Sequence, residues 1–80
     1  MNIGEAVKER ILELCNERGL TVNKLSTISG VTQSTVNNIV SGRNNSATVS
    51  TVKKLCDGLG ITITDFFTSE LFQNLEQEVK

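Results

Sequence analysis

The stretch LSTISGVTQSTVNNI, which runs from Leu25 to Ile39, predicts two short helices joined by a tight turn. Gly30 stands where the chain must bend, because glycine takes a positive φ at little cost. Before it, Leu25 and Ile28 give the first helix an apolar face that we expect to point inward. After it, Thr32 is a typical N-cap residue, since its hydroxyl can accept a hydrogen bond from a free backbone N–H. The stretch therefore predicts a pair of helices packed around a glycine corner.

The second of these helices has one apolar side and one polar, uncharged side. Val36, Ile39 and Val40 recur at helical spacing and should face inward. The outer side carries amides and hydroxyls, from Gln33, Ser34, Asn37, Asn38 and Ser41. Such side chains on an exposed helix suit hydrogen bonding to base edges in a DNA groove. The alternative is that they are solvated polar residues without a binding role.

Helix patterns continue on both sides of this stretch and predict an all-α domain. We expect helices over residues 3–18, 22–29, 33–41 and 49–59, followed by a short helix after Thr62. Each begins after a residue of the N-cap type, in order Asn2, Thr21, Thr32, Thr48 and Thr62. Residues 1–68 are thus predicted to form one compact five-helix domain.

Residues 69–80 form a tail with an apolar pattern of its own. Leu71, Phe72, Leu75 and Val79 follow helical spacing and predict an amphipathic stripe on a sixth helix. Three possibilities remain open for this tail. It packs on its own domain, it joins two copies of the chain in a dimer, or it is a frayed end.

Several spaced segments together resemble a known family. They are RILEL at 10–14, ERGLT at 17–21, the glycine corner, SGR at 41–43, VKKLCDGLGIT at 52–62 and DFF at 65–67. In this order they resemble the lambda-repressor/Cro-like helix-turn-helix family, also called the XRE type, over roughly residues 8–67. The resemblance implies a DNA-binding domain that places the helix after Thr32 in the major groove.

The resemblance also implies which residues would contact DNA. Base edges would be read by Gln33, Ser34, Asn37 and Asn38, with Gln33 in the first turn best placed for adenine. Phosphates would be contacted by Thr32, Thr35, Ser41, Arg43, Asn44 and Asn45. The chain departs from the family at Val22, where relatives usually have a glutamine that contacts a phosphate.

Composition excludes several other functions. The chain of 80 residues has no His, which removes the commonest general base and the commonest zinc ligand. No glycine-rich phosphate loop precedes a helix. We therefore expect neither an enzyme nor a cofactor or metal site, and no small-molecule ligand is evident.

Charge is divided unevenly along the chain, whose net charge is −1. Residues 1–60 hold seven Lys and Arg against five Asp and Glu, whereas residues 61–80 hold one Lys against four Asp and Glu. Residues 1–60 are therefore mildly basic, although the acidic tail makes the net charge of the chain negative. This weak positive charge predicts modest DNA affinity with a shallow salt dependence.

Two thiols and the lack of a targeting segment bear on localisation. Cys15 and Cys56 fall on apolar helix faces and are predicted to be small buried fillers with reduced thiols. A disulfide between them is the alternative. We expect no secretory signal and no membrane span, and therefore a cytoplasmic protein.

These observations favour a sequence-specific DNA-binding transcriptional regulator. We expect a repressor that binds as a homodimer, because one short helix reads only a few base pairs. The alternative is a protein-interaction module, such as an antitoxin or regulatory partner with weak DNA affinity. The acidic balance and Val22 favour the alternative, whereas the amides and Arg43 oppose it.

Overall fold

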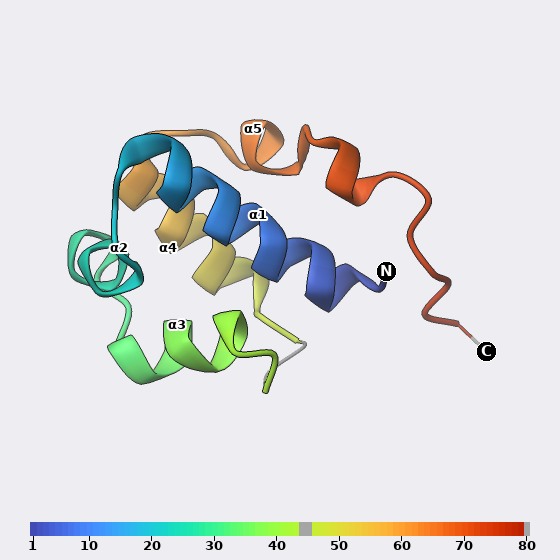
Figure 1. The fold of residues 1–80 in the computed structure, drawn as a ribbon, viewed down its shortest axis with the longest axis horizontal. Coiled ribbons are helices and arrows are strands. Elements are labelled where there is room, and N and C mark those ends of the chain that lie inside the picture. Colours follow the sequence, from blue (N-terminus) through green and yellow to red (C-terminus); the bar gives the residue numbers. More distant parts are fainter. Residues whose placement is uncertain (44–45, 80) are drawn as a thin grey trace.

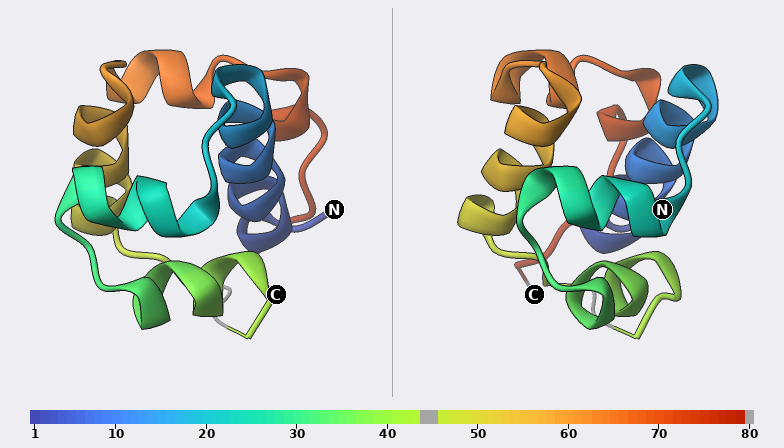
Figure 2. Two further views of the ribbon diagram at one scale, coloured as in Figure 1. Left: turned by 60° about the vertical axis from the view of Figure 1, so that its left-hand side comes forward. Right: turned by 90° about the vertical axis from the view of Figure 1, so that its left-hand side faces the viewer.

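The computed structural model describes residues 1–43 and 46–79 and consists of helices joined by short turns (Figure 1). The helices are α1 (Ile3–Arg18), α2 (Val22–Ser29), α3 (Gln33–Val40), α4 (Val49–Leu59), α5 (Ile63–Phe67) and the 3₁₀ helix η1 (Glu70–Phe72). Figure 2 shows α2 crossing between α1 and α4, with α3 below it. The all-α, five-helix prediction is confirmed. α3 ends one residue earlier than predicted, because Ser41 serves as its C-cap.

Side-chain caps set where the helices begin. Asn2 and Glu5 form a reciprocal capping box at the start of α1, with backbone-to-side-chain distances of 2.8 and 3.0 Å. Thr21, Thr48 and Thr62 each accept from the backbone N–H three residues further on. Each cap satisfies a donor that has no partner inside the helix. Local sequence therefore fixes the element boundaries.

The core draws on all five α-helices. Its buried side chains are Val7, Ile11, Leu14, Cys15, Leu25, Val36, Ile39, Val52, Leu55, Cys56, Leu59 and Phe66. One predicted core residue is wrong, since Ile28 is 42% exposed. Leu25 and Ser26 form the buried side of α2. Around the helix, Ile28 and Ser26 flank Leu25 on opposite sides, so Ile28 lies outside the buried side.

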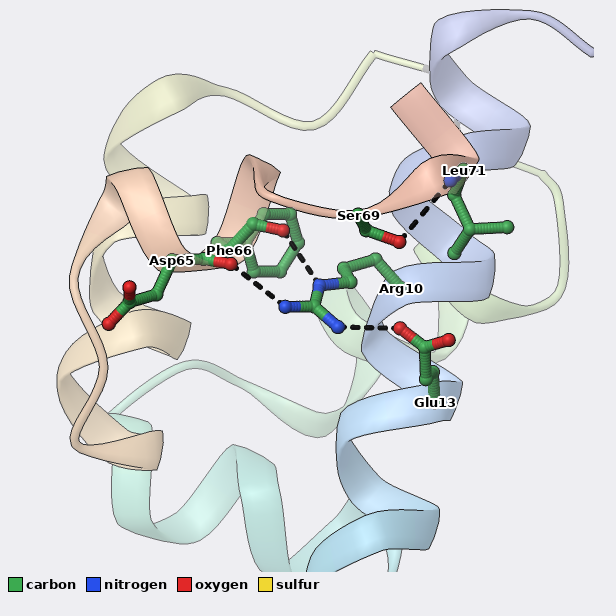
Figure 3. A network of polar contacts seen from close by, with 6 residues as sticks. All are labelled: Arg10, Glu13, Asp65, Phe66, Ser69 and Leu71. Carbon is green, nitrogen blue, oxygen red and sulfur yellow. Dashed lines mark hydrogen bonds and ion pairs between the residues drawn. The ribbon is translucent and has the colours of Figure 1, made fainter. Parts of the chain in front are cut away.

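Arg10 ties α1 to the end of α5 (Figure 3). Its guanidinium donates from Nε to the Phe66 carbonyl at 2.7 Å and from Nη2 to the Asp65 carbonyl at 2.8 Å. The third contact is an ion pair with Glu13. These bonds satisfy carbonyls that the end of a short helix leaves free.

The tail is folded back, but it is not the predicted sixth helix. Only Glu70–Phe72 is helical within residues 69–79, and the chain beyond is irregular. The Phe72 ring lies 6.0 Å from that of Phe66 and 4.8 Å from that of Phe67, centroid to centroid. Further along, Glu76 donates its backbone N–H to the Met1 carbonyl at 3.1 Å. The aromatic contacts and this link replace the helix that the spacing predicted.

Both thiols are free and buried, as predicted. Burial raises the pKa of the Cys15 thiol, and it raises the pKa of the Cys56 thiol although Lys53 partly opposes this. The folded state therefore favours the protonated thiols over the thiolates.

We expect thiol reagents to label the folded protein slowly and the urea-unfolded protein rapidly. Burial raises the pKa of both thiols above the unfolded value of about 8.5. The free energy of unfolding should therefore be unaffected by the thiols below that pH, and it should fall as pH rises toward the folded-state pKa values. Timed labelling at neutral pH, with urea melts at neutral and alkaline pH, checks both points. Rapid labelling of either folded-state thiol would show that the core assignment is wrong.

Candidate nucleic-acid interface

The corner between α2 and α3 has the geometry that the sequence predicted. Gly30 takes φ +66°, a backbone conformation that would be strained for a residue with a side chain. The Val31 N–H donates to the Ser26 carbonyl at 3.1 Å, and Val31 packs against the core. Ser26 is 2% exposed and donates its hydroxyl to the Val22 carbonyl. The small Ser26 side chain, hydrogen-bonded within its own helix, thus lies on the buried side of α2.

α3 is anchored by one side and open on the other. Val36 and Ile39 are buried, at 0% and 2% exposure. Gln33, Ser34 and Asn37 are exposed, so three of the four predicted base-reading side chains share the open side. Asn38, the fourth, is half-buried at the edge of that side.

The predicted phosphate contacts occupy the two ends of α3. At its start, Thr32 Oγ1 accepts from the Thr35 N–H at 3.3 Å and lies 2.8 Å from Thr35 Oγ1. The Thr32 hydroxyl therefore caps α3, and the Thr35 hydroxyl is its hydrogen-bond partner. At its end, Ser41 donates to the Asn38 carbonyl at 3.3 Å, and Arg43 is exposed. Asn44 and Asn45 lie outside the described residues.

Comparisons with known proteins agree with this geometry. A helix-turn-helix family model matches residues 11–66. The chain belongs to this family, in its lambda-repressor-like (XRE) branch. A solved helix-turn-helix structure, "Crystal structure of the prophage Lp1 protein 11", has 38% sequence identity and a TM-score of 0.81, over 94% of this chain and all of the other. No curated protein matches the sequence.

Membership of the helix-turn-helix family bears directly on activity. The family consists of DNA-binding transcription regulators and is not in general one of enzymes. In the part of the chain that the structure describes, no helix is long and apolar enough to cross a membrane. Within that part, too, no three His, Cys, Asp or Glu side chains gather into a group that could hold a metal ion.

The helix-turn-helix unit carries little charge of its own. Every side chain of α3 is neutral, and α2 contributes one cation, Lys24. Elsewhere Arg10 is held by the α5 carbonyls, and Lys53 pairs with Asp57. Few cations therefore remain free to contact phosphates near α3, with Arg43 the closest to it along the chain.

Proposed function

We propose that this protein is a sequence-specific DNA-binding repressor that acts as a homodimer, with α3 in the major groove. The observation that carries the proposal is the open side of α3, where Gln33, Ser34 and Asn37 are exposed beside a rigid glycine corner. Amide side chains pair bidentately with adenine N6 and N7, and hydroxyls pair with several bases. We assign base reading to these three residues together with Asn38 at the edge.

Phosphate contacts on both sides of α3 would fix its position on the duplex. We assign them to Thr32 and Thr35 at its start and to Ser41 and Arg43 after its end. The proposal also includes Asn44 and Asn45, which lie outside the described residues. Since Val22 cannot donate a side-chain hydrogen bond, a phosphate beside it would be bound through the backbone N–H groups at the start of α2.

The short length of α3 favours binding as a dimer. Eight residues of α3 read only a few base pairs, so one copy gives little specificity. A two-fold pair with α3 helices about 34 Å apart would read two successive major grooves. A bound pair would block access to the DNA beneath it.

A protein-interaction module is the second candidate, and one observation favours it. Ile28 is exposed on α2, and Lys24 is the one charged side chain of α2 and α3. An apolar side chain beside the corner suits a protein surface better than a phosphate. We rank it second, because the open side of α3 is neutral and rich in amides rather than apolar or acidic.

Selection from a random double-stranded DNA library separates the two candidates. The full chain is incubated with the library at low salt, and bound sequences are amplified over successive rounds. DNA reading predicts enrichment of a two-fold symmetric motif, with half-sites one helical turn apart. A pool that stays random while the protein is folded would reject DNA reading in favour of a protein partner.

Arg43→Ala should weaken binding to all DNA sequences alike. As a phosphate contact it carries no sequence information, so the preference for the selected site should persist. The slope of log affinity against log salt should shrink by about one unit for each half-site. Affinity titrations over a series of salt concentrations measure this slope.

Arg18→Ala is the matched control for Arg43→Ala. Arg18 is an exposed cation in the last turn of α1. Figure 2 shows that this end of α1 is the one farther from α3. Its loss should leave the salt slope unchanged. A slope that responds to Arg18 but not to Arg43 would move the phosphate contacts to another surface.

A further inference from the structure

α2 and α4 touch at a point where α4 has no side chain. Gly58 lies inside α4, one residue before its end. A Cβ atom at Gly58 would overlap Ser29 Oγ and would stand 3.0 Å from both Cα and Cβ of Ser29. A side chain at position 58 would therefore require the Ser29 hydroxyl to move and the two helices to separate slightly.

Both partners in this contact reduce the stability of the fold. Glycine inside a helix is unfavourable relative to alanine. The Ser29 hydroxyl is buried with no hydrogen-bond partner among the described residues, which is also unfavourable. A contact that has two local costs points to a role other than stability.

The place of the contact indicates that role. Ser29 is the last residue of α2, and the corner that begins at Gly30 leads directly into α3 at Gln33. The close contact with α4 therefore lies at the end of α2, directly before the corner that leads into α3. α3 is also held by its own buried residues, Val36 and Ile39, so a shift at Ser29 would tilt it rather than release it.

We propose that Gly58 is a positioning residue for DNA recognition, which sets the orientation of α3 through its close contact with Ser29. The inference rests on the proposed function. It goes beyond that function in assigning a specificity role to a residue of α4, outside the α2–α3 pair. The Ser29–Gly58 contact sets how closely α2 approaches α4, and α3 follows α2 through the corner at Gly30.

Three variants separate this role from simple destabilisation. Gly58→Ala forces the helices apart. Ser29→Ala removes the orphaned hydroxyl without adding an atom. Combining the two removes the overlap with Oγ but keeps the 3.0 Å approaches to Cα and Cβ, so its displacement should be intermediate. Phe72→Ala is the control, because it loosens the contacts of η1 with Phe66 and Phe67 and leaves Ser29 and Gly58 unchanged.

The measurements are backbone amide chemical shifts of the free proteins, melting temperatures, and affinities for the selected duplex and for random DNA. For Gly58→Ala we expect shift changes that extend through residues 33–41. Its affinity for the selected duplex should fall about tenfold, the worth of one bidentate base contact, with random-DNA affinity within about twofold of wild type. Ser29→Ala should keep the wild-type preference and melt a few degrees higher. Phe72→Ala should melt lower with its preference unchanged.

Several results would overturn the proposal. A folded Gly58→Ala variant with wild-type preference would do so, as would a Phe72→Ala variant with the same loss of preference. If Gly58→Ala does not fold, the double variant decides, and a wild-type preference there rejects the role. Should the wild type prefer no sequence, the proposed function fails separately. The free-protein shifts then still decide whether position 58 controls α3, and changes that stop short of residue 33 would show that it does not.

Discussion

Truncation after Thr68 should lower the melting temperature of the domain by roughly 10–20 °C. The cut removes Phe72, whose ring packs against those of Phe66 and Phe67 and against the core. Phe66 is fully buried, so its ring would lose one wall of its surroundings. Losing a partly buried aromatic side chain and its neighbours costs about 2–4 kcal/mol of unfolding free energy. Thermal melts followed by circular dichroism measure the change.

A second truncation, after Gln73, is the matched control. It keeps the aromatic cluster but removes Glu76, which pairs with the N-terminal amino group at 3.4 Å. Because an exposed ion pair contributes about 0–1 kcal/mol, the melting temperature should fall by less than half as much. Equal effects would mean that the last residues, rather than Phe72, hold the tail in place.

The same variants test whether the tail also joins two copies. Leu71, Phe72 and Leu75 are half-buried on their own domain, whereas Val79 is 82% exposed. Self-packing therefore already uses most of the stripe that a dimer would need. Sedimentation of both truncated proteins checks this, since loss of the dimer without loss of thermal stability would assign the tail to dimerisation instead.

Gln33→Ala should weaken binding to the selected DNA site by about 1–3 kcal/mol and relax its preference at one base pair in each half-site. Gln33 is exposed in the first turn of α3, where the family places residues at base edges. Its amide makes no hydrogen bond to the rest of the described chain that would need to be broken on binding. Affinity for the selected duplex and for duplexes changed at single positions measures the effect.

The tail offers a matched control for Gln33→Ala. Gln73→Ala removes an exposed amide of the same size at the end of η1, outside the α2–α3 pair, and should leave DNA affinity unchanged. An equal loss on selected and random DNA for Gln33→Ala would show that Gln33 contacts the backbone and does not read a base.

Element boundaries could be predicted from the sequence because they depend on local chemistry. Thr21, Thr48 and Thr62 cap helices at the predicted positions, and Gly30 turns the chain with its positive φ. These signals act over three or four residues and need no knowledge of tertiary contacts. The exposed side of α3 follows from the same periodicity, so the exposure of Gln33, Ser34 and Asn37 could be predicted.

Features that depend on contacts between distant segments could not be predicted. The spacing of Leu71, Phe72, Leu75 and Val79 favoured a helix, but the aromatic cluster and the link to Met1 hold the tail in another shape. Burial of Ile28 was expected from its spacing to Leu25, which cannot tell which side of α2 faces α4. Arg10 and Gly58 gave no signal beyond an ion-pair spacing and a glycine inside a helix pattern.

The central claim is that the open side of α3 meets DNA, and backbone amide mapping on a selected duplex tests it most directly. The wild-type protein, labelled with nitrogen-15, is titrated with that duplex, and shift changes are compared along the chain. We predict that the largest changes fall on residues 32–43, with Gln33, Asn37 and Arg43 among them. Changes concentrated on α1, α5 or the tail, with α3 unaffected, would contradict the account.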